Sequence, residues 1–247
     1  MANRQRAEAR RKAQAKAARQ GGGGSLKWLW IGLVTVVAVV AVVVIVSNSG
    51  DDGGDASSTS TGDTSLNGLP DSQPVTVTGD ALPTLSVEFS NWQDDEAIGT
   101  TAPVLAGKDF QGDDIVIDAA ATGKPYMIVF LAHWCPHCNR EVPRLLDWRK
   151  TGGIPDDLQI VGVATAASPS SANYPPAQWF SDKGWSWPVM VDESNGDHNA
   201  GKAAIAMGAP GWPYIVIIGA DGTVKGRVSG ELSLDDIQAF VDTALAS

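Results

Sequence analysis

Positive charge is scarce over most of this 247-residue chain. The sequence holds 18 Lys and Arg residues against 28 Asp and Glu residues, a formal net charge of −10. Eight of the cations lie in residues 1–27, where Glu8 is the single anion, so the rest of the chain is strongly acidic. Binding to nucleic-acid phosphates needs a basic surface. The acidic bulk of the chain therefore argues against a nucleic-acid partner.

Cysteine and histidine are also rare, with two Cys and three His residues in the whole sequence. No cysteine lies directly after the apolar run near the N-terminus, which excludes lipoprotein-type attachment at that end. We find no glycine-rich phosphate-binding motif either. The sequence therefore gives no reason to expect a nucleotide or a flavin.

One long uncharged run is present, at residues 28–46, with the sequence WLWIGLVTVVAVVAVVVIV. As a helix rising about 1.5 Å per residue it spans roughly 28 Å, close to the hydrocarbon thickness of a bilayer. We therefore expect a single transmembrane signal-anchor helix. The cations of residues 1–27 precede it, so the positive-inside rule predicts a basic cytoplasmic head and a C-terminal domain outside the cytoplasm.

A cleaved signal peptide is the alternative reading of this run. The apolar region of such a peptide is usually about 7–15 residues long and ends at a small-x-small site. This run is longer, and Val44-Ile45-Val46 precedes Ser47 without a clean site. The pattern favours an uncleaved anchor in the cell membrane.

The remainder divides into a linker and a folded domain. Residues 47–80 are mostly Gly, Ser, Thr and Asp, and such a composition buries too little apolar surface to fold. We expect a disordered, flexible linker there. Residues 81–247 are long enough to bury one core.

Short apolar runs predict the central strands of this domain. They are apolar at every position, as in strands buried on both faces of an α/β sheet. Helical patterns lie between and after them, and Asp221-Gly222 predicts a hairpin turn. The domain is predicted to have an α/β fold with a mixed sheet and helices on both faces. Strands are expected at 126–131, 158–163 and 214–218, and helices at 138–149, 177–183, 199–207 and 233–246.

Both cysteines lie in one motif, Cys135-Pro136-His137-Cys138, between a predicted strand and a predicted helix. A disulfide over so short a gap removes little entropy from the unfolded chain, so it is a poor structural staple. A cysteine at a helix N-terminus is favoured as the reactive thiolate by free N–H groups and the helix dipole. We expect Cys135 to be the nucleophile, Cys138 to be the more buried resolving thiol, and His137 to tune the pair.

Two other uses of these cysteines are weaker. A zinc site would need Cys135, Cys138, His133 and His137, all within six residues, whereas structural zinc sites usually join two separated pairs of ligands. A thiol protease would not need a second cysteine at this spacing. We therefore expect no metal.

The surroundings of the motif resemble the thioredoxin-like thiol–disulfide oxidoreductases, in particular the TlpA-like and DsbE-like branch. The resemblance covers most of residues 100–245. It is carried by Trp134 before the first cysteine, Gly123-Lys124-Pro125, Glu141-x-Pro143, Thr101-Ala102-Pro103 with Gly107–Gly112, and Pro210–Ile217 followed by Asp221–Val224. The resemblance implies a thioredoxin-like fold with an N-terminal β-hairpin extension.

The resemblance also implies roles for residues outside the motif. Pro213 is expected to be a cis-proline that faces the sulfurs, and the backbone of Trp212 is expected to pair with an extended substrate segment. Pro136 and Trp134 are expected to tune the cysteine pair together with His137. One departure concerns the buried acid that thioredoxins commonly carry six residues before the first cysteine. Val129 occupies that position, so water or a nearby carboxylate such as Glu141 must handle protons.

The direction of the reaction stays open between two readings. The Cys-Pro-His-Cys sequence resembles that of DsbA, a strong oxidant, which favours disulfide formation in cysteine-containing secreted proteins. The membrane tether and the TlpA-like context instead resemble reductases that act on apocytochrome c thiols in cytochrome c maturation. Either direction needs no cofactor beyond the Cys135–Cys138 disulfide, and requires a partner, expected to be a membrane protein, that regenerates the pair.

Two further classes are less favoured. A redox-inert binding module on a thioredoxin scaffold would have no reason to keep both sulfurs. Peroxidases of the peroxiredoxin type carry the motif Pro-x-x-x-Thr-x-x-Cys at the peroxidatic cysteine. Residues 128–134, which precede Cys135, contain no threonine and so do not match this motif.

Overall fold

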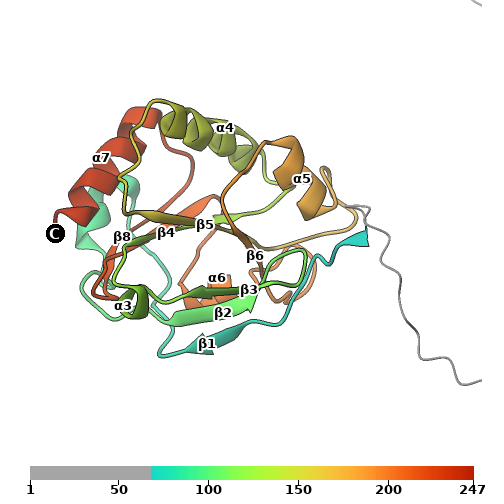
Figure 1. The fold of residues 1–247 in the computed structure, drawn as a ribbon, viewed down its shortest axis with the longest axis horizontal. Helices are drawn as coiled ribbons and strands as arrows, with labels where there is room; N and C mark the ends of the chain where they lie inside the picture. The colour runs from blue at the N-terminus through green and yellow to red at the C-terminus, as the bar shows by residue number, and fades with distance from the viewer. Residues whose placement is uncertain (1–67) are drawn as a thin grey trace, which may run out of the picture. The chain divides into compact units, whose positions relative to one another are not determined.

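The computed structural model describes residues 68–247, which form one mixed β-sheet with helices on both faces (Figure 1). The strands are β1 (Thr76–Thr78), β2 (Val104–Lys108), β3 (Asp114–Ile117), β4 (Tyr126–Leu131), β5 (Gln159–Ala164), β6 (Val189–Val191), β7 (Tyr214–Ile218) and β8 (Val224–Ser229). The helices are the 3-10 helix η2 (Phe89–Asp94), α3 (Ala119–Thr122), α4 (Pro136–Lys150), α5 (Pro176–Asp182), α6 (Lys202–Ala206) and α7 (Leu234–Leu245).

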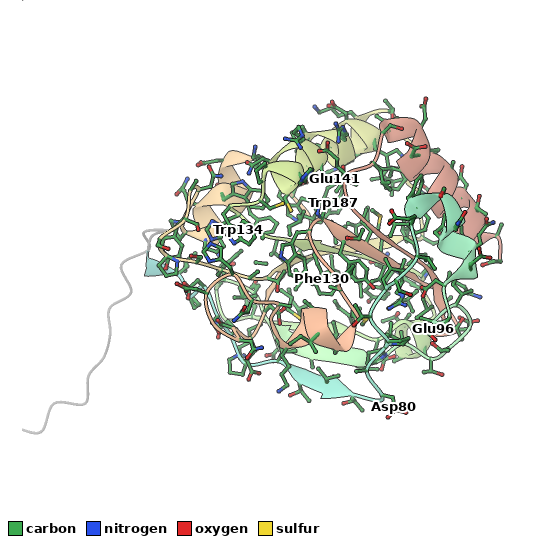
Figure 2. The ribbon with its side chains drawn as sticks, turned by 180° about the vertical axis from the view of Figure 1, so that it is seen from behind. Asp80, Glu96, Phe130, Trp134, Glu141 and Trp187 are labelled. Carbon is green, nitrogen blue, oxygen red and sulfur yellow. The ribbon has the colours of Figure 1, made fainter. Side chains whose placement is uncertain are left out.

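Strand β4 lies at the centre of the sheet. The strand order is β1-β2-β6-β5-β4-β7-β8, and β3 pairs with β2. β4 runs parallel to β5 and antiparallel to β7, while β5 runs parallel to β6. All six residues of β4 are buried, as its uninterrupted apolar sequence predicts. Phe130 of this strand lies in the middle of the molecule (Figure 2).

The two faces of the sheet are covered by different elements. Buried side chains of α4, α5 and α7 form one core, and those of α3 and α6 form a second core with residues from the N-terminal part of the described chain. Figure 1 shows α4 and α7 together on one side of β4 and β5, with α6 and α3 on the other. Four residues join the end of β4 to the start of α4, so the motif lies where the central strand meets the helical layer that contains α4.

Most elements lie where the sequence predicts them. β4 and β7 have the predicted bounds, β5 is displaced by one residue, and the four predicted helices are present with ends that differ by one to three residues. The mixed sheet and the position of the motif between a buried strand and a helix are those that the sequence predicts, and β2 and β3 form the expected N-terminal hairpin.

The expected boundary between linker and domain is wrong. The composition predicts a linker at residues 47–80, but β1 lies inside that range and pairs antiparallel with β2. Val75 is 2% exposed, and its backbone N–H donates to Glu193 at 2.9 Å. The folded region therefore begins before residue 81.

The expected basic head and transmembrane helix, at residues 1–27 and 28–46, lie outside the described residues, as does the linker as far as residue 67. Between residues 68 and 247, none of the helices has the length and apolar character needed to cross a bilayer.

A buried ion pair ties the N-terminal part of the described chain to the far edge of the sheet. Arg227 of β8 is fully buried and donates to both carboxylate oxygens of Asp95, at 2.6 and 2.5 Å. It also donates to the carbonyl oxygens of Pro83 and Met207, at 2.7 and 3.3 Å. Each of the three guanidinium nitrogens of Arg227 thus has a hydrogen-bond acceptor inside the protein. Removal of one partner would leave an uncompensated buried charge.

We expect Asp95→Asn to lower the free energy of unfolding by about 3–5 kcal/mol, the usual cost of breaking a buried ion pair from one side. The measurement is urea unfolding followed by tryptophan fluorescence. Asp94→Asn is the matched control, because Asp94 is the exposed neighbour of Asp95, and it should change stability by less than about 0.5 kcal/mol. Equal effects of the two substitutions would contradict the structural role of the pair.

Candidate active site

The two cysteines lie on the first turn of α4, directly beyond the end of the central strand. Cys135 is the N-cap residue, with extended backbone angles (φ −70°, ψ 121°), and Pro136 is the first residue of the helix. Proline suits this position because the first helical N–H has no partner within the helix. The N–H groups that follow are free to point toward the Cys135 sulfur.

The environments of the two thiols differ strongly. The Cys138 thiol hydrogen-bonds the Cys135 sulfur, and backbone N–H groups of Cys138 and His137 add to this. Together they outweigh burial and lower the pKa of Cys135 from 9.0 to about 6. Cys138 is fully buried, and burial raises the pKa of its thiol far above the ordinary value. One sulfur is therefore set up as a thiolate and the other as a thiol.

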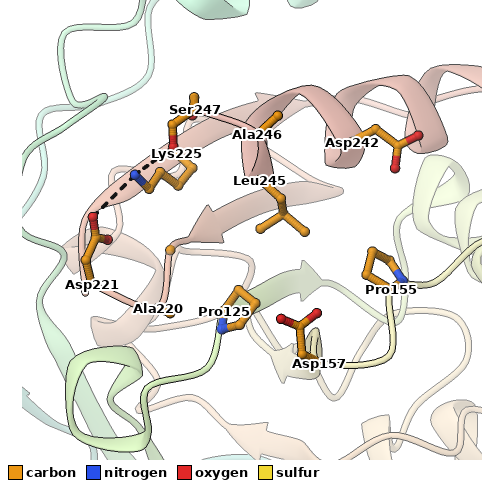
Figure 3. A pocket seen from close by; sticks show the side chains of 11 residues that line it. Pro125, Pro155, Asp157, Ala220, Asp221, Lys225, Asp242, Leu245, Ala246 and Ser247 are labelled. Carbon is orange, nitrogen blue, oxygen red and sulfur yellow. Dashed lines mark hydrogen bonds and ion pairs between the residues drawn. The ribbon is translucent and has the colours of Figure 1, made fainter.

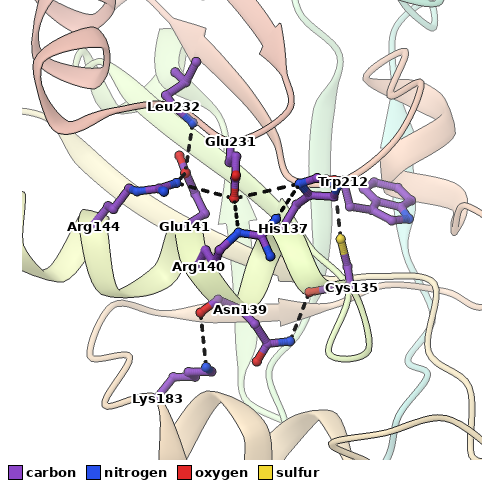
Figure 4. A network of polar contacts seen from close by, with 10 residues as sticks. All are labelled: Cys135, His137, Asn139, Arg140, Glu141, Arg144, Lys183, Trp212, Glu231 and Leu232. Atoms are coloured by element: carbon purple, nitrogen blue, oxygen red, sulfur yellow. Dashed lines mark hydrogen bonds and ion pairs between the residues drawn. The ribbon is translucent and has the colours of Figure 1, made fainter. Parts of the chain in front are cut away.

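The cis-proline loop lies against the Cys135 sulfur. The Trp212–Pro213 peptide bond is cis, and the Cys135 thiol, when protonated, donates to the carbonyl oxygen of Trp212 at 3.5 Å. Figure 4 shows this contact beside the start of α4. The structure thus brings Trp212 and Pro213 together with the motif from 77 residues away.

Trp134 and His133 fix the loop that precedes the cysteines. The indole N–H of Trp134 donates to the carbonyl oxygen of Ala166 at 2.7 Å. His133 is 1% exposed, its Nδ1 contacts the carbonyl oxygen of Ala172 at 2.9 Å, and its Nε2 accepts from the Ser168 N–H at 3.2 Å. Both ring nitrogens are therefore occupied, and burial lowers the pKa of His133.

This arrangement leaves His133 unsuited to binding zinc, because a ligating nitrogen must have a free lone pair. Across the described range 68–247, no three His, Cys, Asp or Glu side chains come close enough together to hold a metal ion.

Glu141 is the buried acid of this site. It lies three residues after Cys138 on α4, so the two side chains share one face of the helix. The Glu141 side chain is fully buried, and its Oε2 accepts from the Leu232 N–H at 3.0 Å. Its Oε1 has no hydrogen-bond partner within the described part of the chain. Burial raises the pKa of Glu141 from 4.5 to about 7, against the opposing effects of the Leu232 N–H and Arg144.

The position six residues before Cys135 carries no proton donor or acceptor. Val129 is fully buried there in β4, as its apolar surroundings predict. Glu141, which follows Cys138 in the sequence, is the buried carboxyl near the motif. The sequence suggested it only as an alternative to water for the proton transfer that the missing acid at Val129 would perform.

Several polar residues around the motif were not predicted. The side chain of Asn139 donates to the carbonyl oxygens of Cys135 and His133, at 3.0 and 3.3 Å. Arg140, Arg144 and Glu231 form a charged cluster beside His137. Asn139, Arg140 and Arg144 follow the motif on the predicted helix, and this position is only weak evidence that they belong to the site. Nothing in the sequence indicates that Glu231 belongs to the site, because 91 residues separate it from Arg140.

An open pocket of about 610 Å³ lies elsewhere, at the start of β4 rather than its end (Figure 3). Pro125, Asp157, Lys225 and Leu245 are among its lining residues, and no residue of the motif contributes to it. Because the cysteines lie beyond the opposite end of β4, this pocket is not part of the cysteine site.

Relatives with known descriptions match parts of the chain. The soluble secreted antigen MPT53 of Mycobacterium tuberculosis is 36% identical over 73 residues, which are 30% of this chain and 37% of that protein. The match therefore spans little more than a third of the relative's length.

Two solved structures are similar to a larger part of the chain. A thioredoxin family thiol:disulfide interchange protein from Chlorobium tepidum is 27% identical with a TM-score of 0.45, and the match covers 59% of this chain and 95% of that one. A secreted Mycobacterium tuberculosis disulfide oxidoreductase, described as homologous to DsbE of E. coli, is 22% identical with a TM-score of 0.41 over 56% and 93% of the two chains.

A mixed sheet with two cysteines at the start of the helix after its central strand defines the class of thioredoxin-like thiol–disulfide oxidoreductases. The family model described as AhpC/TSA matches residues 98–227, more than half of the sequence. This chain belongs to the AhpC/TSA family.

The asymmetry of the two thiols predicts their reactivity. Alkylation of the reduced chain by iodoacetamide should occur at Cys135, with a rate that rises with pH around a midpoint near 6. Cys138→Ala removes the thiol that hydrogen-bonds the Cys135 sulfur, so the midpoint should rise. Cys138→Ser keeps a hydrogen-bond donor to the Cys135 sulfur and should raise the midpoint less. A midpoint that is the same in the wild type and the Cys138→Ala variant would contradict this account.

Glu141 should accelerate the step in which Cys138 acts as a nucleophile. With oxidised glutathione in excess, so that attack by Cys138 limits the rate, Glu141→Gln should slow glutathione release by about 100-fold, within the usual range for general base catalysis. In the wild type this rate should increase as pH rises through about 7, because only the carboxylate accepts a proton.

Glu141→Asp is the matched variant for this experiment, because it keeps a carboxyl group and should retain part of the rate and its pH dependence. An unchanged rate and pH profile in Glu141→Gln would show that protons leave Cys138 by another route.

Proposed function

We propose that this protein exchanges disulfides with cysteine-containing proteins outside the cytoplasm, through Cys135 and Cys138, while tethered to the membrane by residues 28–46. The observation that carries the proposal is the unequal environment of the two sulfurs. Cys135 lies at the helix start with a lowered pKa of about 6, and Cys138 is fully buried beside Glu141. A structural disulfide needs no such difference, whereas an exchange reaction needs one attacking and one resolving thiol.

The reaction proceeds through a mixed disulfide. In the reducing direction, the Cys135 thiolate attacks one sulfur of a partner disulfide, and the other partner sulfur leaves as a thiolate. Cys138 then gives its proton to Glu141 and attacks the Cys135 sulfur. The Cys135–Cys138 disulfide forms and the second partner sulfur is released. In the oxidising direction each step runs in reverse, and protonated Glu141 returns the proton to Cys138. The dithiol pair is the only redox group that this scheme needs.

The cis-proline loop is the proposed contact for the partner chain. The carbonyl oxygen of Trp212 lies 3.5 Å from the Cys135 sulfur, so a segment paired with this backbone would carry its cysteine next to Cys135. Backbone pairing of this kind tolerates many sequences, because it uses groups common to all residues.

Disulfide formation in secreted proteins is the favoured direction. A lowered thiol pKa stabilises the reduced form of the pair and makes it a better oxidant. The value of about 6 for Cys135 lies between the roughly 7 of thioredoxin and the roughly 3.5 of DsbA. The second candidate is reduction of apocytochrome c thiols in cytochrome c maturation. It is favoured by the buried Glu141, since a base beside the resolving thiol speeds release of a reduced partner.

Membership in the AhpC/TSA family does not by itself make the protein a peroxidase. Residues 128–134, which precede Cys135, contain no threonine that would match the peroxidatic motif. Fold and family set the scaffold, and the residues of the site decide the chemistry.

The location and the partners follow from the same proposal. The relative from Mycobacterium tuberculosis is described as a soluble secreted antigen, which supports a location outside the cytoplasm for the domain matched here. After each turnover the pair must be reoxidised or reduced again, and a membrane redox protein is the proposed partner for that step.

The reduction potential of the pair, measured by equilibration with glutathione, tests both the activity and its direction. A value near or above about −150 mV is expected for a disulfide donor, and a value near or below about −250 mV would instead assign the protein to the reductases. Cys138→Ser should accumulate mixed disulfides with partner proteins that dithiothreitol releases, and Cys135→Ser should not. The absence of a titratable couple would refute the proposed function.

A further inference from the structure

A cluster of charged side chains surrounds the histidine of the motif (Figure 4). Arg140, one turn further along α4, places a terminal guanidinium nitrogen 3.0 Å from Nδ1 of His137. Its Nε donates to Oε2 of Glu231 at 2.8 Å. The same carboxylate oxygen lies 3.5 Å from Arg144 and 3.8 Å from Nδ1 of His137. Glu231 belongs to the loop between β8 and α7, so two parts of the fold meet at this point.

The contact between Arg140 and His137 fixes the direction of its hydrogen bond. A guanidinium group has only donors, so Nδ1 of His137 must accept. A ring nitrogen that accepts carries no proton, and the imidazole is then neutral with its proton on Nε2. Arg140 therefore occupies the nitrogen that would have to take up a proton for His137 to become a cation.

Glu231 holds Arg140 in this position. The hydrogen bond from Arg140 lowers the pKa of Glu231, which keeps the carboxylate charged and able to accept from Nε. With Nε held at 2.8 Å, a terminal nitrogen of the same planar group is directed to His137. The same carboxylate offsets part of the positive charge of Arg140, although it is shared with Arg144.

We propose that Arg140 is a positioning residue that keeps His137 neutral and thereby limits the oxidising power of the Cys135–Cys138 pair. The proposal rests on the proposed function and deepens it. A cationic His137 next to the Cys135 thiolate would stabilise the reduced pair and make it a stronger oxidant. To become cationic, His137 must lose the hydrogen bond from Arg140, and its protonated Nδ1 would then lie near the Glu231 carboxylate, which is 3.8 Å away. The charged and titratable groups that face it are Arg140, Arg144, Glu231 and the Cys135 sulfur.

The alternative role of Arg140 is a direct one, in which its own charge stabilises the Cys135 thiolate through space. The two roles predict opposite results for the same substitution. If Arg140 acts by its own charge, its removal weakens the oxidant. If Arg140 acts by holding His137 neutral, its removal strengthens the oxidant, and only when His137 is present and the pH is low enough to protonate it.

The test is the equilibrium constant for exchange with glutathione, measured at pH 5.5 and pH 8 for the full-length chain and for Arg140→Met, His137→Gln and the double variant. At pH 5.5 Arg140→Met should shift the constant toward the reduced pair by about fivefold, where tenfold corresponds to about 30 mV for this two-electron couple. At pH 8 the shift should be small. In the His137→Gln background, Arg140→Met should give no shift toward the reduced pair.

Arg149→Met is the matched control, because Arg149 lies near the far end of α4, where it packs over Trp187. It removes the same charge from the same helix and should leave the constant unchanged at both pH values. A shift toward the oxidised pair in Arg140→Met, with or without His137, would overturn the proposal in favour of direct charge stabilisation. Equal constants for Arg140→Met and the wild type at pH 5.5 would overturn it as well.

A second readout does not depend on redox chemistry. Long-range ¹H–¹⁵N spectra of the reduced chain at pH 7 should show His137 protonated at Nε2 alone, and Arg140→Met should convert part of it to the cation or to the other tautomer. An unchanged spectrum in Arg140→Met would contradict the proposal. If the wild-type chain shows no redox couple, the proposed function fails, while this spectrum still tests the contact between Arg140 and His137.

Discussion

The site depends on one constraint, which is that two sulfurs on the same helical turn have opposite surroundings. Cys135 caps the start of α4, where N–H groups without helical partners and the Cys138 thiol stabilise its anion. Cys138, three residues later, faces the core and is fully buried. The helix must begin at the motif so that Cys135 meets its free N–H groups, and it must pack against the sheet so that Cys138 is buried. Both conditions follow from a central strand buried on both faces that runs straight into an amphipathic helix.

The remaining parts of the site are brought to this turn by the antiparallel half of the sheet. Pairing of β7 with β4 places the loop before Tyr214 next to the Cys135 sulfur, and β8 continues into the loop that supplies Glu231 and Leu232. The buried pair of Arg227 and Asp95 holds β8 against the N-terminal segment. This ion pair is far from the sulfurs in sequence, yet it fixes the strand from which the charged neighbours of α4 extend.

The parts of the fold that could be predicted are those with a strong local signal. β4 and β7 are apolar at every position, which few structures other than a central strand accommodate. β1 was missed because Thr76-Val77-Thr78 is only three residues long and follows a Gly, Ser and Asp-rich stretch, and its pairing with β2 makes it a strand. In the site, the motif and Pro213 are visible in the sequence. Glu231 is not, because its role depends on a contact between loops that no local pattern encodes.

The charged cluster beside α4 joins the two sulfurs in a way that the motif alone does not reveal. The Arg144 guanidinium lies 3.5 Å both from Oε2 of Glu141 and from Oε2 of Glu231. Glu141 is the proposed proton acceptor for Cys138, and Glu231 accepts a hydrogen bond from Arg140, whose guanidinium contacts His137. Because Arg144 contacts both carboxylates and the charge of Glu231 raises the pKa of Glu141, the two carboxyl groups do not titrate independently. Under the proposed mechanism we therefore expect the reduction potential of the pair and the rate of its resolving step to depend on this one network, and not on Pro136 and His137 alone.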